Sequence, residues 1–422
     1  MIIFSKGRKM KKALLFVLCV VMALCAFAAV QAQEVVEINV PTMRIGINSS
    51  AEWFAERSAA FNAEYGDRIK VNIEEIAGDQ NLVDKIKVLY SANSLPSAFD
   101  LGGYNVIDMM QDQLVDLTPY IDEETRANAS DICWEVNTRN GKILGMPFTR
   151  QVIGYFYNKD HFAAAGIEKP AETWEEFFED CEKLKAAGFT PLSMDTADSG
   201  WVTSLMLGAM IGGTDEGEAW MNTALPTDYN TEAFIDAATK IQYMFQNYTT
   251  PDAIGGAYEH AAANFFIEET SMIANGPWMV SDFYDTTMVD EGFADRIGVA
   301  MYPGAVMYNS GKIGWQVGAK DEKELEAAIT YVKFMTSVES QLKMLEMTGD
   351  TPAADVASDN VYPLVNETTA LTENAKHSIN DFQSLWYANV VDEISVQYPL
   401  LAQGTITPEQ FAQALTDTAL KN

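Results

Sequence analysis

Strand-like and helix-like runs alternate over the first hundred residues, and this alternation constrains the fold more than any other feature. A β-rich run at 36–47 is followed by an amphipathic run at 51–65. A second strand-like run at 69–76 is followed by a helix-like run at 81–91, and a short third strand is expected at 99–101. Strands separated by helices with short connections predict βαβ units and a parallel sheet. The chain is therefore predicted to be an α/β protein.

The loops that follow the early strands are the first place to look for a ligand site. In open α/β sheets, ligands bind outside the carboxyl ends of the strands. Here those ends are 46–50, which carries Gly46, Asn48 and Ser49, and 102–104, which carries two glycines and Tyr104. We expect a ligand to lie near these two loops.

The rest of the chain predicts more helices and a second domain. Thr173-Trp174-Glu175-Glu176 has the pattern of a capping box, in which Thr173 and Glu176 satisfy each other's backbone amides. A chain of 422 residues is too long for one compact core, and no Pro-rich or Ser-rich linker divides it. We therefore expect two domains joined by short crossing strands. Helices are predicted at 177–187, 231–247, 322–337 and 407–420.

The first 32 residues are predicted to be a signal peptide. A basic stretch at 6–12 precedes an unbroken apolar run at 13–30, and Val30-Gln31-Ala32 offers a cleavage site before Gln33. An uncleaved membrane anchor is the alternative. Lipidation at Cys25 is less favoured because Leu24 occupies the place of a small residue. We expect secretion across the cytoplasmic membrane into the periplasm as a soluble protein.

Charge and cysteine content exclude several classes of function. The chain has 60 acidic and 28 basic residues, a net charge of −32, so phosphate backbones and anionic lipids would repel it. We expect no nucleic-acid partner. Beyond the signal peptide only Cys133 and Cys181 remain, and whether they form a disulfide stays open. With three histidines in the whole chain and no CxxC pair, we predict no metal site.

Motifs of catalysis and of cofactor binding are not found. There is no G-x-S-x-G sequence, and the histidines have no evident Ser or Cys partner. The run that starts at Asp195 resembles the beginning of a calcium loop, but Met206 stands where that loop needs Glu. Gly311-Lys312 lacks the upstream glycine of a phosphate loop. We therefore predict no cofactor.

Three tryptophans beside glycine-containing turns are the most unusual feature. They are Trp201, Trp278 and Trp315, each within two residues of a glycine. An indole at such a turn can offer its face to the apolar C–H face of a sugar ring, whose hydroxyls then need Asp, Glu, Asn or Arg. Three core tryptophans are the competing interpretation, and the residues alone do not decide between the two.

Several runs together resemble family 1 extracellular solute-binding proteins, the maltose-binding-protein-like receptors of ABC importers. The central one is Gly-Lys-Ile-Leu-Gly-Met-Pro-Phe at 141–148, followed by Tyr-Phe-Tyr-Asn-Lys-Asp at 155–160. The match extends in order over nearly the whole chain after the signal peptide. The further runs are 165–168, 173–177, 272–278, 314–315, 333–335, 348–353 and 385–387.

The resemblance implies a two-lobed periplasmic-binding-protein fold, type II-like. Each lobe would be a mixed sheet flanked by helices, with the ligand cleft at the hinge. Crossings between the lobes are expected near 147–153, near 313–318 and after Pro352. Lobe 1 would comprise 33–149 and 319–351, and lobe 2, with the hinge segments, 150–318 and 352–422.

The resemblance also implies a binding receptor that captures a mono- or oligosaccharide by hinge closure and delivers it to an ABC permease. A monomer is expected. Arg150 would donate two hydrogen bonds to vicinal hydroxyls or form a hinge ion pair, and Asp195 would accept from hydroxyls or cap a turn. The expected stacking residues are Trp278, Trp386, Trp201 and Trp315, and the expected polar residues are Asn48, Ser49, Glu52, Gln80 and Tyr104.

Two other functions compete with sugar capture. A receptor of the same fold could bind a polyamine, which suits an acidic cleft with aromatic walls. A secreted carbohydrate-active enzyme is the more remote alternative, disfavoured by the scarcity of histidine and by the extent of the receptor resemblance.

Overall fold

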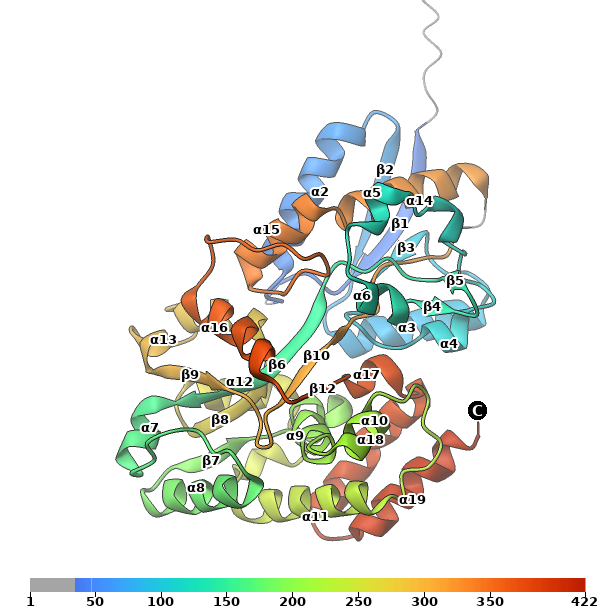
Figure 1. Ribbon diagram of the computed structural model, residues 1–422. Coiled ribbons are helices and arrows are strands. Elements are labelled where there is room, and N and C mark those ends of the chain that lie inside the picture. Colours follow the sequence, from blue (N-terminus) through green and yellow to red (C-terminus); the bar gives the residue numbers. More distant parts are fainter. Residues whose placement is uncertain (1–34, 47, 320, 422) are drawn as a thin grey trace, which may run out of the picture.

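The computed structural model describes residues 35–46, 48–319 and 321–421, and its helices and strands form two lobes around separate hydrophobic cores (Figure 1). The first lobe is built on the cores between Ile38 and Phe148, completed by residues from Ile313 to Ala353. The second lobe is built on the core from Ile153 to Tyr308 and from Leu345 to Ala419. The predicted two-lobed α/β fold is confirmed. The predicted signal peptide and Cys25 lie outside the described residues.

The first lobe begins with the predicted strand–helix–strand unit. Strand β1 (Val36–Thr42) pairs in parallel with β2 (Ile69–Glu75), and α2 (Ala51–Tyr65) connects them. Trp53, Phe54 and Phe61 of α2 are buried, so this helix covers the core with its aromatic face. The remaining elements are α3 (Asp79–Ser91), β3 (Ala98–Phe99), α4 (Ile107–Met110), α5 (Glu123–Arg126), α6 (Asp131–Val136), β4 (Thr138–Arg139), β5 (Lys142–Ile143), β11 (Gln316–Val317), α14 (Glu322–Met335) and α15 (Val338–Thr348).

The second lobe contains a six-stranded mixed sheet. Its strands lie in the order β12 (His377–Ile379), β10 (Val306–Gly311), β6 (Arg150–Asn158), β8 (Thr270–Asn275) and β7 (Thr190–Ser193), with β9 (Ile297–Ala300) also on β6. The covering helices are α7 (Lys159–Ala164), α8 (Trp174–Ala186), α9 (Trp201–Ile211), α10 (Asp215–Met221), α11 (Glu232–Asn247), α12 (Tyr258–Phe266), α13 (Phe293–Arg296), α16 (Pro363–Leu371), α17 (Phe382–Leu385), α18 (Ala388–Ala402) and α19 (Pro408–Ala419).

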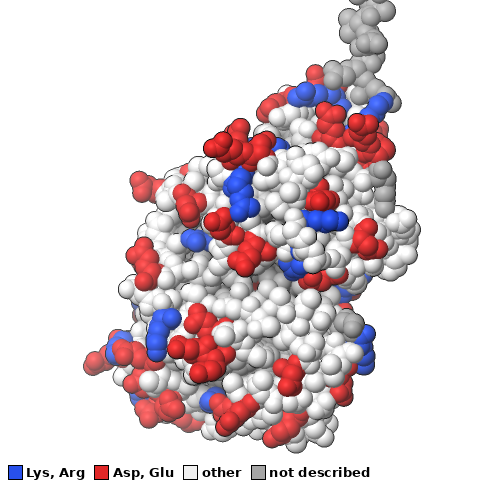
Figure 2. All heavy atoms as spheres, turned by 45° about the vertical axis from the view of Figure 1, so that its right-hand side comes forward, with Lys and Arg blue, Asp and Glu red and all other residues white. Residues whose placement is uncertain are grey.

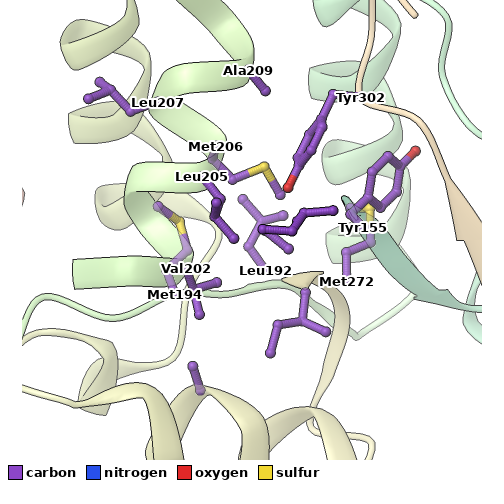
Figure 3. Close-up of a cluster of buried hydrophobic side chains, with 14 of the residues drawn as sticks. Tyr155, Leu192, Met194, Val202, Leu205, Met206, Leu207, Ala209, Met272 and Tyr302 are labelled. Carbon is purple, nitrogen blue, oxygen red and sulfur yellow. The ribbon is translucent and has the colours of Figure 1, made fainter. Parts of the chain in front are cut away.

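Helix α9 lies in the middle of the second core. Figure 3 shows Leu205 and Met206 of α9 beside Leu192 and Met272, which come from strands β7 and β8. Nearly every side chain of α9 is buried, because the sheet packs on one face and neighbouring helices on the others. A helix that is apolar all round is typical of such a position. The core therefore fixes Trp201, the first residue of α9, at the edge of the lobe.

Three chain segments lie side by side where the lobes meet. Strand β10 pairs antiparallel with the start of β6, from Tyr308 opposite Ile153 to Gly311 opposite Arg150. Isolated bridges join Met146 to Trp315 and Thr149 to Pro352. A Cβ on Gly314 would stand 2.0 Å from the Met146 carbonyl oxygen, so only glycine allows this approach. These are the segments at which the resemblance predicts crossings, and the wider division of the chain between the lobes stays a prediction.

Two local predictions have definite outcomes. The capping box is confirmed, because the Thr173 hydroxyl accepts from the Glu176 amide and Glu176 accepts from the Thr173 amide. The cysteines, whose pairing the sequence left open, form no disulfide: Cys133 and Cys181 are both free, and they lie in the cores of different lobes. Among the helices of the described part, none has the length and hydrophobicity of a membrane span.

Candidate binding site between the lobes

Three aromatic side chains of the second lobe meet at the boundary with the first. The ring of Trp201 lies 6.0 Å from that of Trp278 and 5.8 Å from that of Tyr258, at 51° and 79°. All three are partly exposed, although they pack against the second core. We call this group, with Tyr104, Asp79 and Lys312 across from it, the interlobe site.

The local backbone explains why the two indoles stand there. Before Trp201 the chain passes through three residues with positive φ: Asp198 (49°), Ser199 (71°) and Gly200 (51°). Positive φ at two non-glycine residues is strained and is characteristic of functional loops. Before Trp278, a Cβ on Gly276 would lie 2.2 Å from the indole, so the ring folds back over the glycine. Sequence reasoning proposed both tryptophans, but it missed Tyr258, which gives no signal beyond lying at the start of a helix.

Tyr104 connects the two lobes at one end of the site. Its side chain packs against the cores of both lobes, and its hydroxyl contacts Ser199 and Gln383 of the second lobe. Next to it, the Asn105 amide donates to the Gln383 carbonyl oxygen at 2.8 Å, which ties the loop to α17. Burial and the nearby Asp79 raise the pKa of Tyr104, so the phenol stays protonated as a donor. The structure thus places the predicted Tyr104 at the interlobe site.

Carboxylates surround the aromatic group. Desolvation by neighbouring protein raises the pKa of Asp79, although the residue is exposed, and Arg44 and Lys312 oppose the shift. Its charge acts on Tyr258 and on Glu259, both in the second lobe. Asp381 is buried, and burial raises its pKa to about 6 although Lys312 opposes the shift. The site therefore combines apolar ring faces with several hydrogen-bond acceptors.

The predicted polar residues of the first loops lie in different environments. Asn48 accepts from the Ser50 amide and hydroxyl at 3.0 and 2.6 Å, and so holds its own loop together. Gln80 donates to Asp84 one helical turn further on, at 2.9 Å. Ser49 and Glu52 are exposed. Nothing in the structure brings these four to the aromatic group, and their ligand contacts stay a prediction.

Arg44 is a buried cation that sequence reasoning missed. It donates to Asp100 at 2.5 Å and to Ser50 at 2.6 Å, and its guanidinium lies over the rings of Trp53 and Phe148. Because those contacts use its charge and its planar face, Arg44 stabilises the first lobe beneath the 46–50 loop. A buried ion pair between distant residues leaves no local pattern in a sequence.

Arg150 lies at the start of β6, between the lobes. Its backbone amide donates to the Thr351 carbonyl oxygen at 2.9 Å, and Gly311 is its strand partner. Its Nε is buried, with no hydrogen-bond partner among the described residues. No ion pair of Arg150 occurs in the described part of the chain, so the hinge pair is not formed there, and its donation to hydroxyls stays a prediction.

Two of the four tryptophan predictions are corrected. Trp315 is 1% exposed and packs against Phe148 and Tyr331 in the first core. Trp386 is 1% exposed and is enclosed by the aromatic rings of the second core, among them Tyr229 and Phe234. Neither can offer a ring face to a ligand in this structure. The core interpretation that the sequence left open applies to Trp315, and Trp386, which the resemblance placed at the site, is a core residue as well.

Asp195 is also corrected. Its carboxyl is fully buried and accepts from the amides of Thr203 at 3.1 Å and Val202 at 3.4 Å, in the first turn of α9. A carboxylate at a helix N-terminus satisfies free amides and interacts well with the helix dipole. Asp195 therefore has the second of its two predicted roles, and it is closed to a ligand.

Away from this site, one group of possible metal ligands occurs among the described residues. Asp215, Glu218 and His377 have ligand atoms within 4.8 Å of one another. Nδ1 of His377 is already hydrogen-bonded to Glu218 at 2.8 Å, and Asp215 is exposed. Sequence reasoning did not find this group, because His377 lies far along the chain from α10.

A fold of two lobes with an aromatic and polar site between them defines a ligand-binding protein of the two-lobed class. The family model described as "Bacterial extracellular solute-binding protein" matches residues 56–373. The chain belongs to this family of binding proteins.

Individual relatives share about a quarter of their residues with this chain over the matched regions. The multiple sugar-binding protein of Streptococcus mutans is 26% identical over 255 residues, 57% of this chain and 58% of that protein. An sn-glycerol-3-phosphate-binding periplasmic protein of Brucella abortus is 25% identical over 229 residues, 50% of this chain and 49% of that protein. The matches thus span about half the length of these relatives.

Solved structures confirm the fold over almost the whole chain. A chitin oligosaccharide binding protein superposes with a TM-score of 0.82 at 20% identity, over 92% of this chain and 98% of that one. A solute-binding protein in complex with raffinose gives a TM-score of 0.70 at 20% identity, covering 91% and 98%. At such identities the likeness concerns the fold alone.

Proposed function

We propose that this protein is the receptor of an ABC importer that captures a mono- or oligosaccharide between its lobes and delivers it to a membrane permease. The observation that carries the proposal is the pair of partly exposed indoles, Trp201 and Trp278, with Tyr258 beside them. Such rings suit the C–H faces of a pyranose, and the carboxylates and phenols around them suit its hydroxyls. Sugar-binding relatives and neighbours support the same ligand class.

A polyamine is the weaker candidate at this site. A polyamine would need a free aromatic face for its ammonium groups. Lys312 already holds its Nζ 5.8 Å from the Trp278 ring centroid, which places a cation at that face. An ammonium group of the polyamine at this ring would lie close to the ammonium group of Lys312, and repulsion between them would oppose binding.

We propose that the protein acts by hinge closure, without catalysis, as a secreted monomer with no nucleic-acid partner. Ligand between the lobes stabilises the closed arrangement by contacts that the open one lacks. On the face that Figure 2 shows, acidic side chains are scattered over both lobes and outnumber the basic ones, which accords with repulsion from nucleic acids. Long incubation with oligosaccharides should yield no shorter products by chromatography.

A ligand panel tests the proposal directly. Maltose, raffinose, xylo-oligosaccharides, chito-oligosaccharides, putrescine and spermidine are titrated against intrinsic tryptophan fluorescence. We expect a saturable change with at least one sugar, because Trp201 and Trp278 would stack on it. No fluorescence change with any sugar, together with a saturable change with a polyamine, would overturn the assignment.

A further inference from the structure

Lys312 is fixed at the point where the chain returns from the second lobe to the first. It lies between β10 and β11, and its carbonyl oxygen accepts from Nδ2 of Asn137 at 2.9 Å. Asn137 is fully buried and also accepts from the Gly314 amide at 3.0 Å. Asn137 therefore anchors the chain to the first lobe at the carbonyl of Lys312 and again two residues later.

The side chain of Lys312 reaches across both lobes. Its methylene stem lies against the backbone of Gly103, where a Cβ would stand 2.8 Å from Cε and 3.0 Å from Cγ. Its Nζ lies 5.8 Å from the centroid of the Trp278 ring, in the second lobe. Gly103 is held with φ of +105°, and its neighbour Tyr104 contacts Ser199 and Gln383. One side chain thus lies against Gly103 of the first lobe and places its charge near the Trp278 ring of the second.

The ammonium group of Lys312 has carboxylates nearby but forms no ion pair with them in the described part of the chain. The carboxylates of Asp79 and Asp381 lie within reach of its field, one from each lobe. Across residues 35–46, 48–319 and 321–421, no ion pair or hydrogen bond of its Nζ is formed. Arg44, the other cation near Asp79, is already bound to Asp100 and Ser50. An ammonium has three donors, so those of Lys312 are available to a ligand.

We propose that Lys312 orients Trp278 and donates to an acceptor oxygen of the ligand, and that the carboxylates around it restrict the site to uncharged carbohydrates. A neutral sugar can stack on Trp278 and accept from Nζ while its hydroxyls donate to Asp79. A phosphorylated or carboxylated sugar would bring a further negative charge beside Asp79 and Asp381, and repulsion would exclude it. This proposal rests on the proposed carbohydrate function.

The orienting role is tested without ligand. Lys312→Met keeps the methylene stem and removes the charge, and Lys343→Met changes an exposed lysine of α15 as the matched control. We expect Lys312→Met, and not Lys343→Met, to increase quenching of tryptophan fluorescence by acrylamide. In a Trp278→Phe background the same change should have no effect, because the ring that responds is gone. Equal quenching of Lys312→Met and wild type would overturn the orienting role.

The donor role is tested by calorimetry with the sugar that binds best in the panel. Loss of a hydrogen bond from a charged donor should weaken binding about tenfold or more in Lys312→Met. Lys312→Arg should recover part of that loss, and Lys343→Met should match wild type. Unchanged affinity in Lys312→Met would refute the donor role, and tight binding of glycerol 3-phosphate or glucose 6-phosphate by wild type would refute the charge restriction. If wild type binds no sugar, the proposed function fails, while the quenching result still decides the orienting role.

Discussion

Trp278 is the residue whose removal should affect ligand binding most. Its indole is partly exposed, contacts Trp201 and lies beneath Lys312, so it has the surroundings of a binding hot spot. We expect Trp278→Ala to weaken sugar binding by about 1–3 kcal/mol, with a smaller effect on the melting temperature. Calorimetry and thermal unfolding of the same preparation measure both. Unchanged affinity would assign the ring to packing.

A buried tryptophan gives the matched control. Trp386 is enclosed by core rings, and its Nε1 has no partner in the described part of the chain. Trp386→Phe should therefore lower the free energy of unfolding by about 1–3 kcal/mol through lost packing. Its sugar affinity should match wild type, because the ring never reaches the interlobe site.

Gly103 offers a second prediction at this scale. An alanine there would adopt a strained positive φ and would also displace the stem of Lys312. Gly141 has φ of +77° with open space around its Cβ position, so Gly141→Ala carries the strain alone. We expect both substitutions to cost about 1 kcal/mol of stability, and only Gly103→Ala to weaken sugar binding. Denaturant unfolding and calorimetry separate the two effects, and equal affinities of the two variants would contradict the contact.

Single residues also mark the limit of prediction from sequence. Trp278 and Trp315 both follow a glycine within two residues, yet Trp278 is partly exposed and Trp315 is buried. The difference arises because Trp315 faces the side chains of Phe148 and Tyr331, which are remote in sequence. In the sequence, Gly311-Lys312 is only an incomplete phosphate-loop pattern, because the position of the lysine relative to Gly103 depends on the folded chain.

At the scale of helices and strands, local patterns predicted much of what is observed. The runs 51–65 and 69–76 correspond to α2 and β2, and the capping box at Thr173 begins one residue before α8. These features depend on periodicity and on contacts within one turn, which a sequence contains. The mixed pairing of the second sheet could not be predicted in this way, because β6 pairs with strands more than 100 residues away.

One contact between helices of different lobes should affect closure. Lys87 of α3 donates to Asp392 of α18 at 2.7 Å, and the two side chains are 21% and 48% exposed. Such an exposed pair contributes about 0.2–1 kcal/mol at most. We expect Asp392→Asn to weaken sugar binding up to about fivefold at low salt, because closure loses this contact, and the difference should disappear in about 1 M salt.

The control for this prediction is an ion pair within one lobe. Lys240 and Asp236 are one turn apart on α11, so Asp236→Asn removes a comparable charge without touching the lobe boundary. It should leave affinity unchanged at every salt concentration. Equal effects of the two substitutions would indicate a general influence of net charge.

At the scale of the whole molecule, the acidic residues at the interlobe site are expected to affect ligand binding, and those buried in the cores are expected to affect stability. Asp79 lies at the interlobe site, where the proposed closure would change its surroundings, whereas Asp195 is buried inside the second lobe. Titration of Asp79 should therefore change ligand affinity, and titration of Asp195 should change the free energy of unfolding. Because each lobe has its own core, a change inside one core should reach the site only through unfolding.

Asp195 makes the stability part of this separation measurable. Burial raises its pKa to about 7, against the opposing amide hydrogen bonds from Thr203 and Val202, whereas the unfolded chain has a value of about 3.9. The folded state therefore holds a proton that the unfolded state releases. The contribution of Asp195 to the free energy of unfolding is complete below about pH 4 and is lost as pH rises to about 7. Between pH 5 and pH 8 the free energy of unfolding of wild type should fall by about 2 kcal/mol, and that of Asp195→Asn should not show this decrease. Denaturant unfolding of both proteins at the two pH values gives this difference, and the same pH dependence in both would show that Asp195 is ionised in the fold.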